Sequence, residues 1–202
     1  MGVIGEGMME KCDWCKGNEL SEKYHDEEWG IPLHDDRKQF EFLMMEVMQC
    51  GLNWNMMLKK RHIFRQCFDN FDYSKIAEYD DEKVQEIMET PGMIRSERKI
   101  RAVINNARRF LQIIEEFGSF DTYLWSWTEG KTIVYRSHQA QWVAKNELSD
   151  AISADLKKRG FKYLGSVTVY SHLQACGMIN DHEEKCFLYE EICGRYSVEY
   201  RR

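Results

Sequence analysis

The chain has 202 residues, enough for one large domain or two closely packed lobes with a substantial core. Its seven cysteines are odd in number and irregularly spaced, which argues against a disulfide framework and for a reducing compartment. Glu6 and Glu10 interrupt the first ten residues, so we expect no signal peptide and no transmembrane helix. The sequence therefore predicts a cytoplasmic protein, with residues 1–8 as a disordered tail.

The net charge is −6, but the basic residues are not evenly distributed. Half of the 28 lysines and arginines fall in the stretches 59–65, 95–109 and 157–162, which contain a single acidic residue, Glu97. Such segregation can present a basic face to phosphates while an acidic remainder keeps the protein soluble. Ordinary solvated helix faces would give the same pattern, so both interpretations stay open.

Apolar residues recur at spacings of three and four through most of the chain, which predicts a helical protein. Pro32 and Pro91 both fall where this pattern stops. Residues 167–170 (VTVY) have strand propensity but no partner strand, and residues 129–147 look like the longest irregular connection. We expect helices at about 36–50, 54–68, 73–79, 81–90, 96–116, 119–127, 149–159, 166–178 and 181–192.

The N-terminal segment before the first of these helices contains potential metal ligands. Thiolate and imidazole groups are the ligands that Zn²⁺ prefers, and Cys12, Cys15 and His25 offer them. Cys12 and Cys15 have zinc-knuckle spacing, whereas pairing of Cys12 with His25 depends on how the intervening loop folds. Buried free cysteines more often behave as small hydrophobic residues, so the spacing alone leaves the question open.

The connection between the first two predicted helices has an unusual composition. Gly51 can end one helix and Asn53 can cap the next, which displays Leu52 at a tight corner between Glu46 and Trp54. Glu46 as a solvent-facing residue at a helix end, and Trp54 as a core residue, are the simpler interpretations of the same positions.

Residues 88–95 form a second informative junction, between two amphipathic helices. Gly92 is free to take a positive φ, and basic residues, starting with Arg95, open the following helix. A helix-hairpin-helix of this kind directs backbone N–H groups at a phosphate. A plain corner between two helices would use the same residues.

Another pair of potential ligands lies near the end of the chain. His182 and Cys186 are four residues apart, which would place them on one face of the predicted helix 181–192. If they share one ion with Cys12 and His25, the metal joins the first and last segments. A Cys₂His₂ shell leaves no open coordination position, so such a site would be structural.

Together these features resemble the DNA-3-methyladenine glycosylase I family, the constitutive bacterial enzymes of the helix-hairpin-helix superfamily. The resemblance runs from residue 9 to about residue 188, in order and without large gaps. Its motifs are MEKCDW at 9–14, YHDEEWG at 24–30, E-x₂-Q-x-G-L-x-W at 46–54 followed by LKKR, GMIRSERKIRAVINNA at 92–107, DLKKRGFKYLG at 155–165 and QACGMINDH at 174–182.

The resemblance implies roles for particular residues. It places Glu46 at the acidic, catalytic position of the base pocket and Trp54 and Tyr24 at the aromatic positions that hold the base. Gly51 and Leu52 correspond to the loop that fills the gap left in the duplex. The hairpin residues Gly92 and Arg95 are expected to contact DNA. The structural Zn²⁺ ligands implied are Cys12, His25, His182 and Cys186, and this set disfavours Cys15 as a ligand.

The fold implied is all-α, a helix-hairpin-helix DNA glycosylase fold whose second lobe is made of both chain ends joined by a structural zinc. We expect a single globular unit over 9–193 and a disordered tail over 194–202. Within the unit, one lobe spans 35–128 with the hairpin near 81–107, and the zinc-joined lobe combines 9–34 with 129–193.

The function implied is excision of 3-methyladenine from alkylated DNA by monofunctional hydrolysis of the N-glycosidic bond, leaving an abasic site. The expected partners are double-stranded DNA containing alkylated adenine and free 3-methyladenine as product, with no membrane, and we expect a monomer. The alternatives are a catalytically altered helix-hairpin-helix DNA-binding protein and a glycosylase for another alkylated base. Ser21 stands where the family commonly has a second tyrosine, and Asn53 and Asn55 also depart from its pattern, which puts base affinity and range in doubt.

Overall fold

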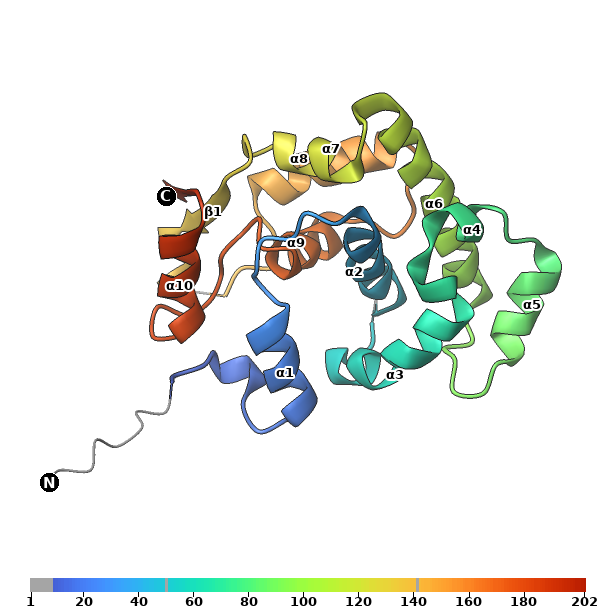
Figure 1. Ribbon diagram of the computed structural model, residues 1–202, viewed down its shortest axis with the longest axis horizontal. Helices are drawn as coiled ribbons and strands as arrows, with labels where there is room; N and C mark the ends of the chain where they lie inside the picture. Colours follow the sequence, from blue (N-terminus) through green and yellow to red (C-terminus); the bar gives the residue numbers. More distant parts are fainter. Residues whose placement is uncertain (1–8, 50, 141) are drawn as a thin grey trace, which may run out of the picture.

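Helices form most of the protein in the computed structural model, which describes residues 9–49, 51–140 and 142–202 (Figure 1). The prediction of a mostly helical chain is confirmed, and within these ranges two short strands correct the expectation that it is all-α. The α-helices are α1 Glu19–Glu27, α2 Asp36–Gln49, α3 Trp54–Cys67, α4 Tyr73–Ala77, α5 Asp81–Glu89, α6 Glu97–Phe117, α7 Phe120–Ser126, α8 Glu147–Lys158, α9 Ser166–Ala175 and α10 Phe187–Arg195. The 3-10 helices are η1 Asp13–Cys15, η2 Asp69–Phe71 and η3 Arg136–Ala140, and the strands are β1 Thr132–Tyr135 and β2 Val198–Arg201.

Helix α2 lies at the centre of the main apolar core. Every residue from Gln39 to Met48 is buried, because α3, α6, α7 and α9 pack around this helix (Figure 1). A helix that is buried on all sides needs apolar residues around its whole circumference, and α2 supplies them with Phe, Leu, Met and Val side chains. The exceptions in this buried stretch are Gln39, Glu41 and Glu46, and they are therefore the residues whose burial needs an explanation.

Helix α6 is the longest helix of the described chain, with 21 residues, and it is strongly amphipathic. Its apolar face packs against α2, α4, α5 and α7. Among the helices that the structure describes, none is both long and apolar enough to cross a membrane.

Helix α1 lies in a segment for which the sequence predicts no helix. The Asn18 side chain accepts a hydrogen bond from the Ser21 backbone N–H at 3.1 Å, and Glu19 and Glu22 occupy the first turn, where acidic residues favour a helix start. The helix buries the neighbouring side chains of Tyr24 and His25.

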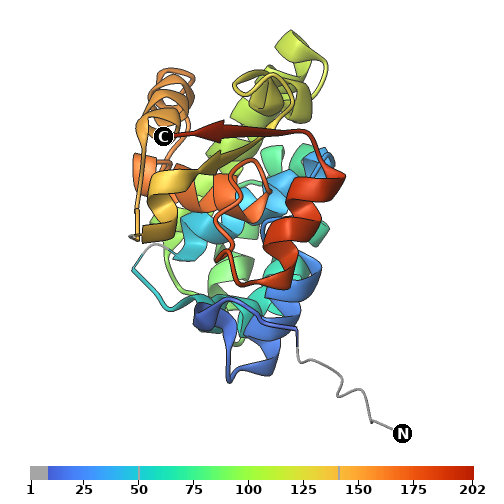
Figure 2. The ribbon, with the colours of Figure 1, turned by 90° about the vertical axis from the view of Figure 1, so that its left-hand side faces the viewer.

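The N-terminal segment lies beside the segment that leads into α10. The Phe187 N–H donates to the Glu10 carbonyl at 2.9 Å, and the Asp13 N–H donates to the Glu183 carboxylate at 2.6 Å. In Figure 2 the N-terminal segment and α10 occupy neighbouring positions, consistent with these bonds. The division into lobes at residues 35 and 129 stays a prediction, and the expected tail 1–8 lies outside the described residues.

The expectation of a disordered tail over 194–202 is wrong. Helix α10 continues to Arg195, and β2 pairs in parallel with β1, in register from Thr132 opposite Val198 to Tyr135 opposite Arg201 (Figure 2). Strand β1 also makes a bridge from Ile133 to Ile179. The segment 129–147 is therefore less irregular than expected, whereas the VTVY run lies within α9.

The last helix begins later than predicted. Residues 181–186 are not helical. A hydrogen bond from the Cys186 N–H to the Glu183 carbonyl at 2.7 Å closes a turn over residues 183–186, and Cys186 is the N-cap of α10. The expectation that His182 and Cys186 share one face of a helix is thus wrong, although both side chains are buried.

Candidate functional site

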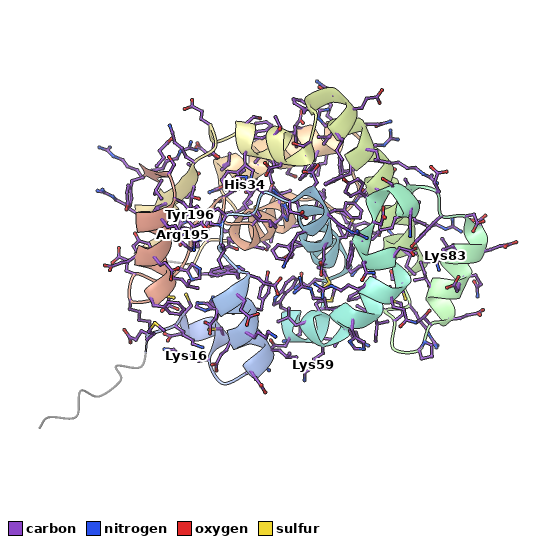
Figure 3. All side chains as sticks on the ribbon, in the orientation of Figure 1. Lys16, His34, Lys59, Lys83, Arg195 and Tyr196 are labelled. Carbon is purple, nitrogen blue, oxygen red and sulfur yellow. The ribbon has the colours of Figure 1, made fainter. Side chains whose placement is uncertain are left out.

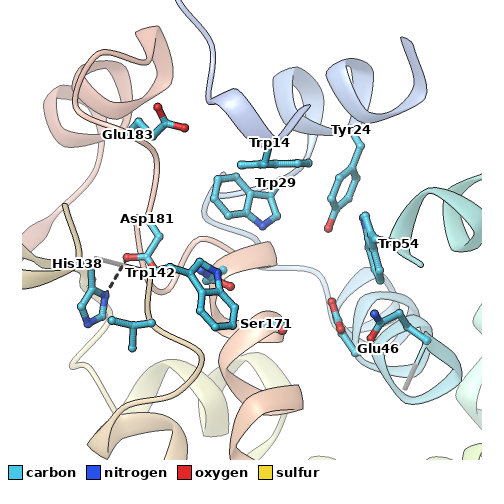
Figure 4. A pocket seen from close by; sticks show the side chains of 13 residues that line it. Trp14, Tyr24, Trp29, Glu46, Trp54, His138, Trp142, Ser171, Asp181 and Glu183 are labelled. Atoms are coloured by element: carbon cyan, nitrogen blue, oxygen red, sulfur yellow. Dashed lines mark hydrogen bonds and ion pairs between the residues drawn. The ribbon is translucent and has the colours of Figure 1, made fainter. Parts of the chain in front are cut away.

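A cavity of about 690 Å³ opens between the N-terminal segment, the α2–α3 corner and the segment that follows β1 (Figure 4). Its volume falls within the range of small-molecule sites, roughly 300–1,000 Å³. Aromatic and carboxyl side chains predominate in its lining, which consists of Trp14, Tyr24, Trp29, Glu46, Gln49, Trp54, His138, Trp142, Val143, Ser171, Gln174, Asp181 and Glu183.

Tyr24 and Trp54 form an aromatic pair in this lining. Their ring centroids are 5.5 Å apart with an angle of 50° between the planes, and Tyr24 also packs edge-on against Phe42. Tyr24 comes from α1 and is buried, whereas Trp54 is the first residue of α3 and is half-buried. The pair therefore offers one fixed ring and one partly accessible ring to a planar ligand.

Glu46 reaches the cavity from the last turn of α2 and is only 7 % exposed. Burial raises the pKa of its carboxyl to about 8. Burial and the nearby charge of Glu46 also raise the pKa of Tyr24 well above its ordinary value. A carboxyl with a strongly raised pKa beside two aromatic rings in a cavity is the arrangement expected of a functional group rather than a surface residue.

The corner between α2 and α3 presents Gly51 and Leu52 next to Glu46 and Trp54. Gly51 is exposed and Leu52 is half-buried. Gln49 fixes the corner, because its side-chain amide donates to the Leu52 carbonyl at 2.7 Å while its own carbonyl accepts from the Leu52 N–H at 2.6 Å. The structure thus brings Tyr24, Glu46 and Trp54 together in one cavity, with Gly51 and Leu52 in the corner between the helices that carry Glu46 and Trp54. The roles of all five residues stay predictions.

The hairpin between α5 and α6 contains Gly92 with φ +81°. A Cβ at this position would lie 2.8 Å from Ile63 Cδ1 of α3, so both the backbone conformation and the space favour glycine. Lys60 donates to the Gly92 carbonyl, and Lys99 of α6 donates to the Met48 carbonyl at the end of α2 at 2.8 Å. These bonds place the hairpin, followed by the exposed Arg95, on the same side of the protein as the α2–α3 corner.

Cys12, His25, His182 and Cys186 form one buried cluster beside the cavity. One ligand atom from each lies within 4.8 Å of the others. Cys12 Sγ is 3.4 Å from His182 Nδ1, and Cys186 Sγ is 3.4 Å from His25 Nε2 and 3.6 Å from His182 Nδ1. A tetrahedral zinc with ordinary Zn–S and Zn–N bonds separates sulfur from nitrogen by about 3.5 Å, so the four side chains fit a metal of this kind.

The remaining nitrogen of each imidazole has an acceptor. His25 Nδ1 lies 2.8 Å from the Asp26 carboxylate, and His182 Nε2 lies 3.1 Å from the Trp29 carbonyl. Such partners fix the orientation of metal-binding histidines. Gly30 permits the close approach of His182, because a Cβ at this residue would lie 2.4 Å from His182 Nε2. Cys15 is excluded from the cluster, since its thiol donates to the Cys12 carbonyl at 3.1 Å.

Trp29 connects this cluster with the cavity. Its ring packs edge-on against His182 with centroids 4.7 Å apart, and Trp14 packs against the same ring at 5.0 Å. Both tryptophans line the cavity (Figure 4). The cluster therefore supports one wall of the cavity without contributing a ligand atom to its lining.

Comparison with known proteins connects this arrangement to a family. Residues 14–189 match the sequence family described as methyladenine glycosylase. The protein belongs to the methyladenine glycosylase family. A curated relative, DNA-3-methyladenine glycosylase 1 of Escherichia coli (strain K12), is 40 % identical over 182 residues, which cover 90 % of this chain and 97 % of the relative.

Solved structures of the family have the same fold. A crystal structure of 3-methyladenine DNA glycosylase I matches with a TM-score of 0.82 and 41 % identity, covering 88 % of this chain and 98 % of that chain. The enzyme from Staphylococcus aureus, in a structure on 3-methyladenine recognition, matches with a TM-score of 0.83 and 32 % identity, covering 90 % and 97 %. The mostly helical architecture is therefore that of the methyladenine glycosylases.

Two of the departures noted in the sequence contact each other in this methyladenine glycosylase. Ser21 is buried, and its hydroxyl donates to the side-chain oxygen of Asn55. Ser21 does not belong to the described cavity lining, and Asn53 caps α3 by accepting from the Asn55 N–H at 2.8 Å. The serine thus joins α1 to α3 through a polar contact, three residues before Tyr24 in α1 and directly after Trp54 in α3.

The basic stretches are only partly available to a polyanion. Arg61 forms ion pairs with Glu28 and Glu41, and Arg159 forms ion pairs with Glu116 and Asp155. Other basic residues of these stretches, Lys59, Arg95, Arg98, Lys157, Lys158 and Lys162, are exposed, and Figure 3 shows Lys59 on the outer side of α3.

Sequence reasoning missed much of the cavity wall. Trp29 follows His25 in the YHDEEWG motif and could have been found from that proximity. His138 and Trp142 lie in a segment interpreted as an irregular connection, and no spacing pattern indicates that they face Glu46 and Trp54. Their position depends on the β1–β2 pairing, which is not visible in the sequence periodicity.

Proposed function

We propose that this protein is a DNA repair glycosylase that excises 3-methyladenine from alkylated DNA by hydrolysing the N-glycosidic bond. Family membership supports the reaction, and relatives of the same fold are named as 3-methyladenine DNA glycosylases. The observation that carries the proposal is the buried Glu46 carboxyl beside the Tyr24–Trp54 pair in one cavity.

The cavity chemistry suits an alkylated adenine. An N3-alkylated adenine in DNA is cationic, and aromatic faces attract cations by about 0.5–2 kcal/mol per contact. Trp54 offers a partly accessible face, Tyr24 supports it, and the Glu46 carboxylate is an acceptor for the edge of the base. Because the alkylated base is already a good leaving group, selective binding of the cation supplies much of the catalysis.

Water is the proposed nucleophile. A bifunctional mechanism needs an amine in the site, and the described cavity lining contains no lysine. The products are then free 3-methyladenine and an abasic site.

The proposed substrate is double-stranded DNA. Reaching a base inside a duplex requires flipping the nucleotide, at a cost of a few kcal/mol that is lower for a damaged pair. Leu52 at the α2–α3 corner is the apolar wedge for the gap, and Gly51 allows close approach of the backbone. The hairpin at Gly92, with Arg95 exposed behind it, is the proposed phosphate contact.

The Cys/His cluster is proposed to hold a structural Zn²⁺. Two sulfurs and two nitrogens at tetrahedral spacing, with both imidazoles oriented by acceptors, support this identity. The metal would cross-link the chain ends and steady Trp29, and a shell with four protein ligands leaves it no direct part in bond cleavage.

Release of free 3-methyladenine from methylated duplex DNA tests the activity. We expect release by the wild type and a loss of at least about 100-fold in single-turnover rate for Glu46→Gln, the range for removing a positioned catalytic group. Trp54→Ala should weaken base binding more than it changes the rate at saturation.

Binding of an abasic duplex is the control for these variants. Glu46→Gln should bind the duplex as the wild type does, because the wedge and hairpin are unchanged. A wild type that binds the abasic duplex but releases no base would overturn the enzyme proposal and favour a DNA-binding protein without catalysis. Release of a different alkylated base would correct only the substrate.

A further inference from the structure

One wall of the cavity is formed by residues other than the proposed base-binding ones. Opposite Tyr24, Glu46 and Trp54, it is lined by His138, Trp142 and neighbouring side chains (Figure 4). A volume of about 690 Å³ falls within the range for drug-sized ligands, and a single purine is smaller than these. The space beyond the base-binding residues therefore has room for another part of the DNA.

Trp142 is the most accessible large apolar side chain in the described chain, at 87 % exposed, yet it lines this cavity. An indole that is both exposed and part of a cavity lining lies at the rim. In the view of Figure 4 it stands between the His138 side and the Glu46–Trp54 side. When a planar group stacks on an exposed aromatic ring, apolar surface of the ring is removed from water, which favours binding.

The segment that carries Trp142 is anchored at its start. The rings of Tyr135 and His138 stack with centroids 4.5 Å apart. His138 Nδ1 lies 3.1 Å from the Asp181 carboxylate and 2.9 Å from the Tyr170 hydroxyl. Gln174 donates to the same carboxylate at 2.9 Å. The His138 end is therefore joined to α9 and to the turn before α10.

The strands and α8 anchor the segment further. Pairing with β2 holds β1 directly before it, and Arg136 lies over the Tyr200 ring at 5.3 Å. At the other end, Asn146 and Ser149 form a capping box at the start of α8. Strand β2 lies beyond residues 14–189, so its pairing with β1 and the Arg136–Tyr200 contact involve a part of the chain outside the family match.

We propose that Trp142 stacks on an unstacked nucleobase of the damaged strand, next to the nucleotide that occupies the Glu46–Trp54 end of the cavity. The inference rests on the proposed function, since it assumes that damaged DNA enters this cavity. Aromatic stacking tolerates any base, because every base has a π face. Trp142 thus contributes to affinity for DNA and not to recognition of the alkylated base.

The experiment compares Trp142→Ala, Trp142→Phe and the wild type on a duplex with a stable abasic-site analogue and on free 3-methyladenine. We expect Trp142→Ala to weaken duplex binding about tenfold, within the range for loss of one base-stacking contact. Trp142→Phe should stay within about threefold of the wild type, since a phenyl ring still stacks. Affinity for the free base, measured by calorimetry, should be the same in all three proteins.

Two controls separate stacking from other effects. The dependence of duplex affinity on salt should keep the same slope in Trp142→Ala, whereas loss of a phosphate contact reduces it. Leu20→Ala, at another exposed apolar residue outside the cavity lining, should leave duplex affinity unchanged. Because Trp142 is so exposed, its replacement should not perturb folding, which thermal unfolding checks.

The outcomes are distinct from those that test the proposed function. Unchanged duplex affinity in Trp142→Ala would overturn the inference, and so would an equal loss of free-base affinity or an equal effect of Leu20→Ala. A wild type that binds the abasic duplex but excises nothing would defeat the enzymatic function and leave the stacking role intact. A wild type that binds no duplex would overturn both.

Discussion

Glu46 combines two properties that rarely occur together in a residue of a helical core. It is buried in α2 among apolar side chains, and it lines a cavity together with the aromatic rings of Tyr24 and Trp54. Burial disfavours its charged form, which is why its pKa rises to about 8. The protein therefore carries a carboxyl whose charge depends on pH near neutrality and on any cation that enters the cavity.

This pKa predicts how the stability of Glu46→Gln depends on pH. The folded-state pKa of about 8 exceeds the ordinary value of 4.5, so Glu46 carries no penalty below pH 4.5 and costs stability as pH rises toward 8. Glutamine removes this cost. We expect the stability of Glu46→Gln relative to the wild type to increase by about 3 kcal/mol between pH 5 and pH 8 in denaturant titrations. A difference that is the same at both pH values would mean that the carboxyl stays ionised in the folded protein.

The same group predicts the pH profile of excision. If the carboxylate is the active form, kcat/KM for a methylated duplex should rise about tenfold per pH unit from pH 6 and level off near pH 8. The apparent pKa of kcat should be lower than that of kcat/KM, because a bound cationic base favours the carboxylate. Excision that decreases with rising pH would instead assign activity to the protonated acid.

At the scale of elements, the α5–α6 hairpin is held by contacts that a single methyl group would disturb. Gly92 has φ +81° and faces Ile63, and Lys60 bonds to its carbonyl. We expect Gly92→Ala to lower stability by about 1–2 kcal/mol, from backbone strain and the contact with Ile63. It should also weaken binding to an abasic duplex while leaving affinity for free 3-methyladenine unchanged.

Gly118→Ala is the matched control for this prediction. Gly118 has φ +87° at the end of α6, and a Cβ there would meet no atom within 4 Å. It should cost comparable backbone strain without an effect on duplex affinity. If both variants weaken duplex binding equally, the hairpin has no specific role in the contact.

How far the elements could be predicted depends on the range of the interactions that form them. Helices such as α2 and α6 repeat an apolar pattern over three or more turns, so local spacing was enough to place them within a residue or two. Helix α1 has polar residues on most positions and is held by its Asn18 cap and by contact with α3, which no periodicity indicates. Strands β1 and β2 are more than 60 residues apart in sequence, and each exists only because the other pairs with it.

The candidate site divides in the same way. Glu46, Leu52 and Trp54 lie within one short corner, so the sequence could group them. His182 and Cys186 were grouped correctly for an incorrect reason, because a turn and not a helix brings them together. Trp142 could not be placed at all, since its position follows from β1–β2 pairing and from the His138 contacts.

At the scale of the whole molecule, the N-terminal segment is joined to the segment before α10. Hydrogen bonds from Phe187 to Glu10 and from Asp13 to Glu183 join the residues that flank Cys12, His182 and Cys186 in sequence, and the Trp29 ring contacts His182 and lines the cavity. Because residues from both ends support the wall that carries Trp14 and Trp29, integrity of the cluster and shape of the cavity are physically linked.

This linkage predicts the effect of metal removal. We expect one zinc per chain in protein purified without chelators, and Cys12→Ser should lose the metal and several kcal/mol of stability, since metal binding contributes directly to folding. Cys15→Ser is the control: its buried thiol donates to the Cys12 carbonyl and does not belong to the four-residue cluster of the described chain, so the variant should keep its zinc and most of its stability. Metal content by mass spectrometry and thermal unfolding with and without chelator measure both. Less than one zinc per chain in the wild type, or equal zinc loss in the two variants, would exclude the four-ligand site. Loss of zinc should also weaken binding of free 3-methyladenine, because the cavity wall at Trp29 depends on His182.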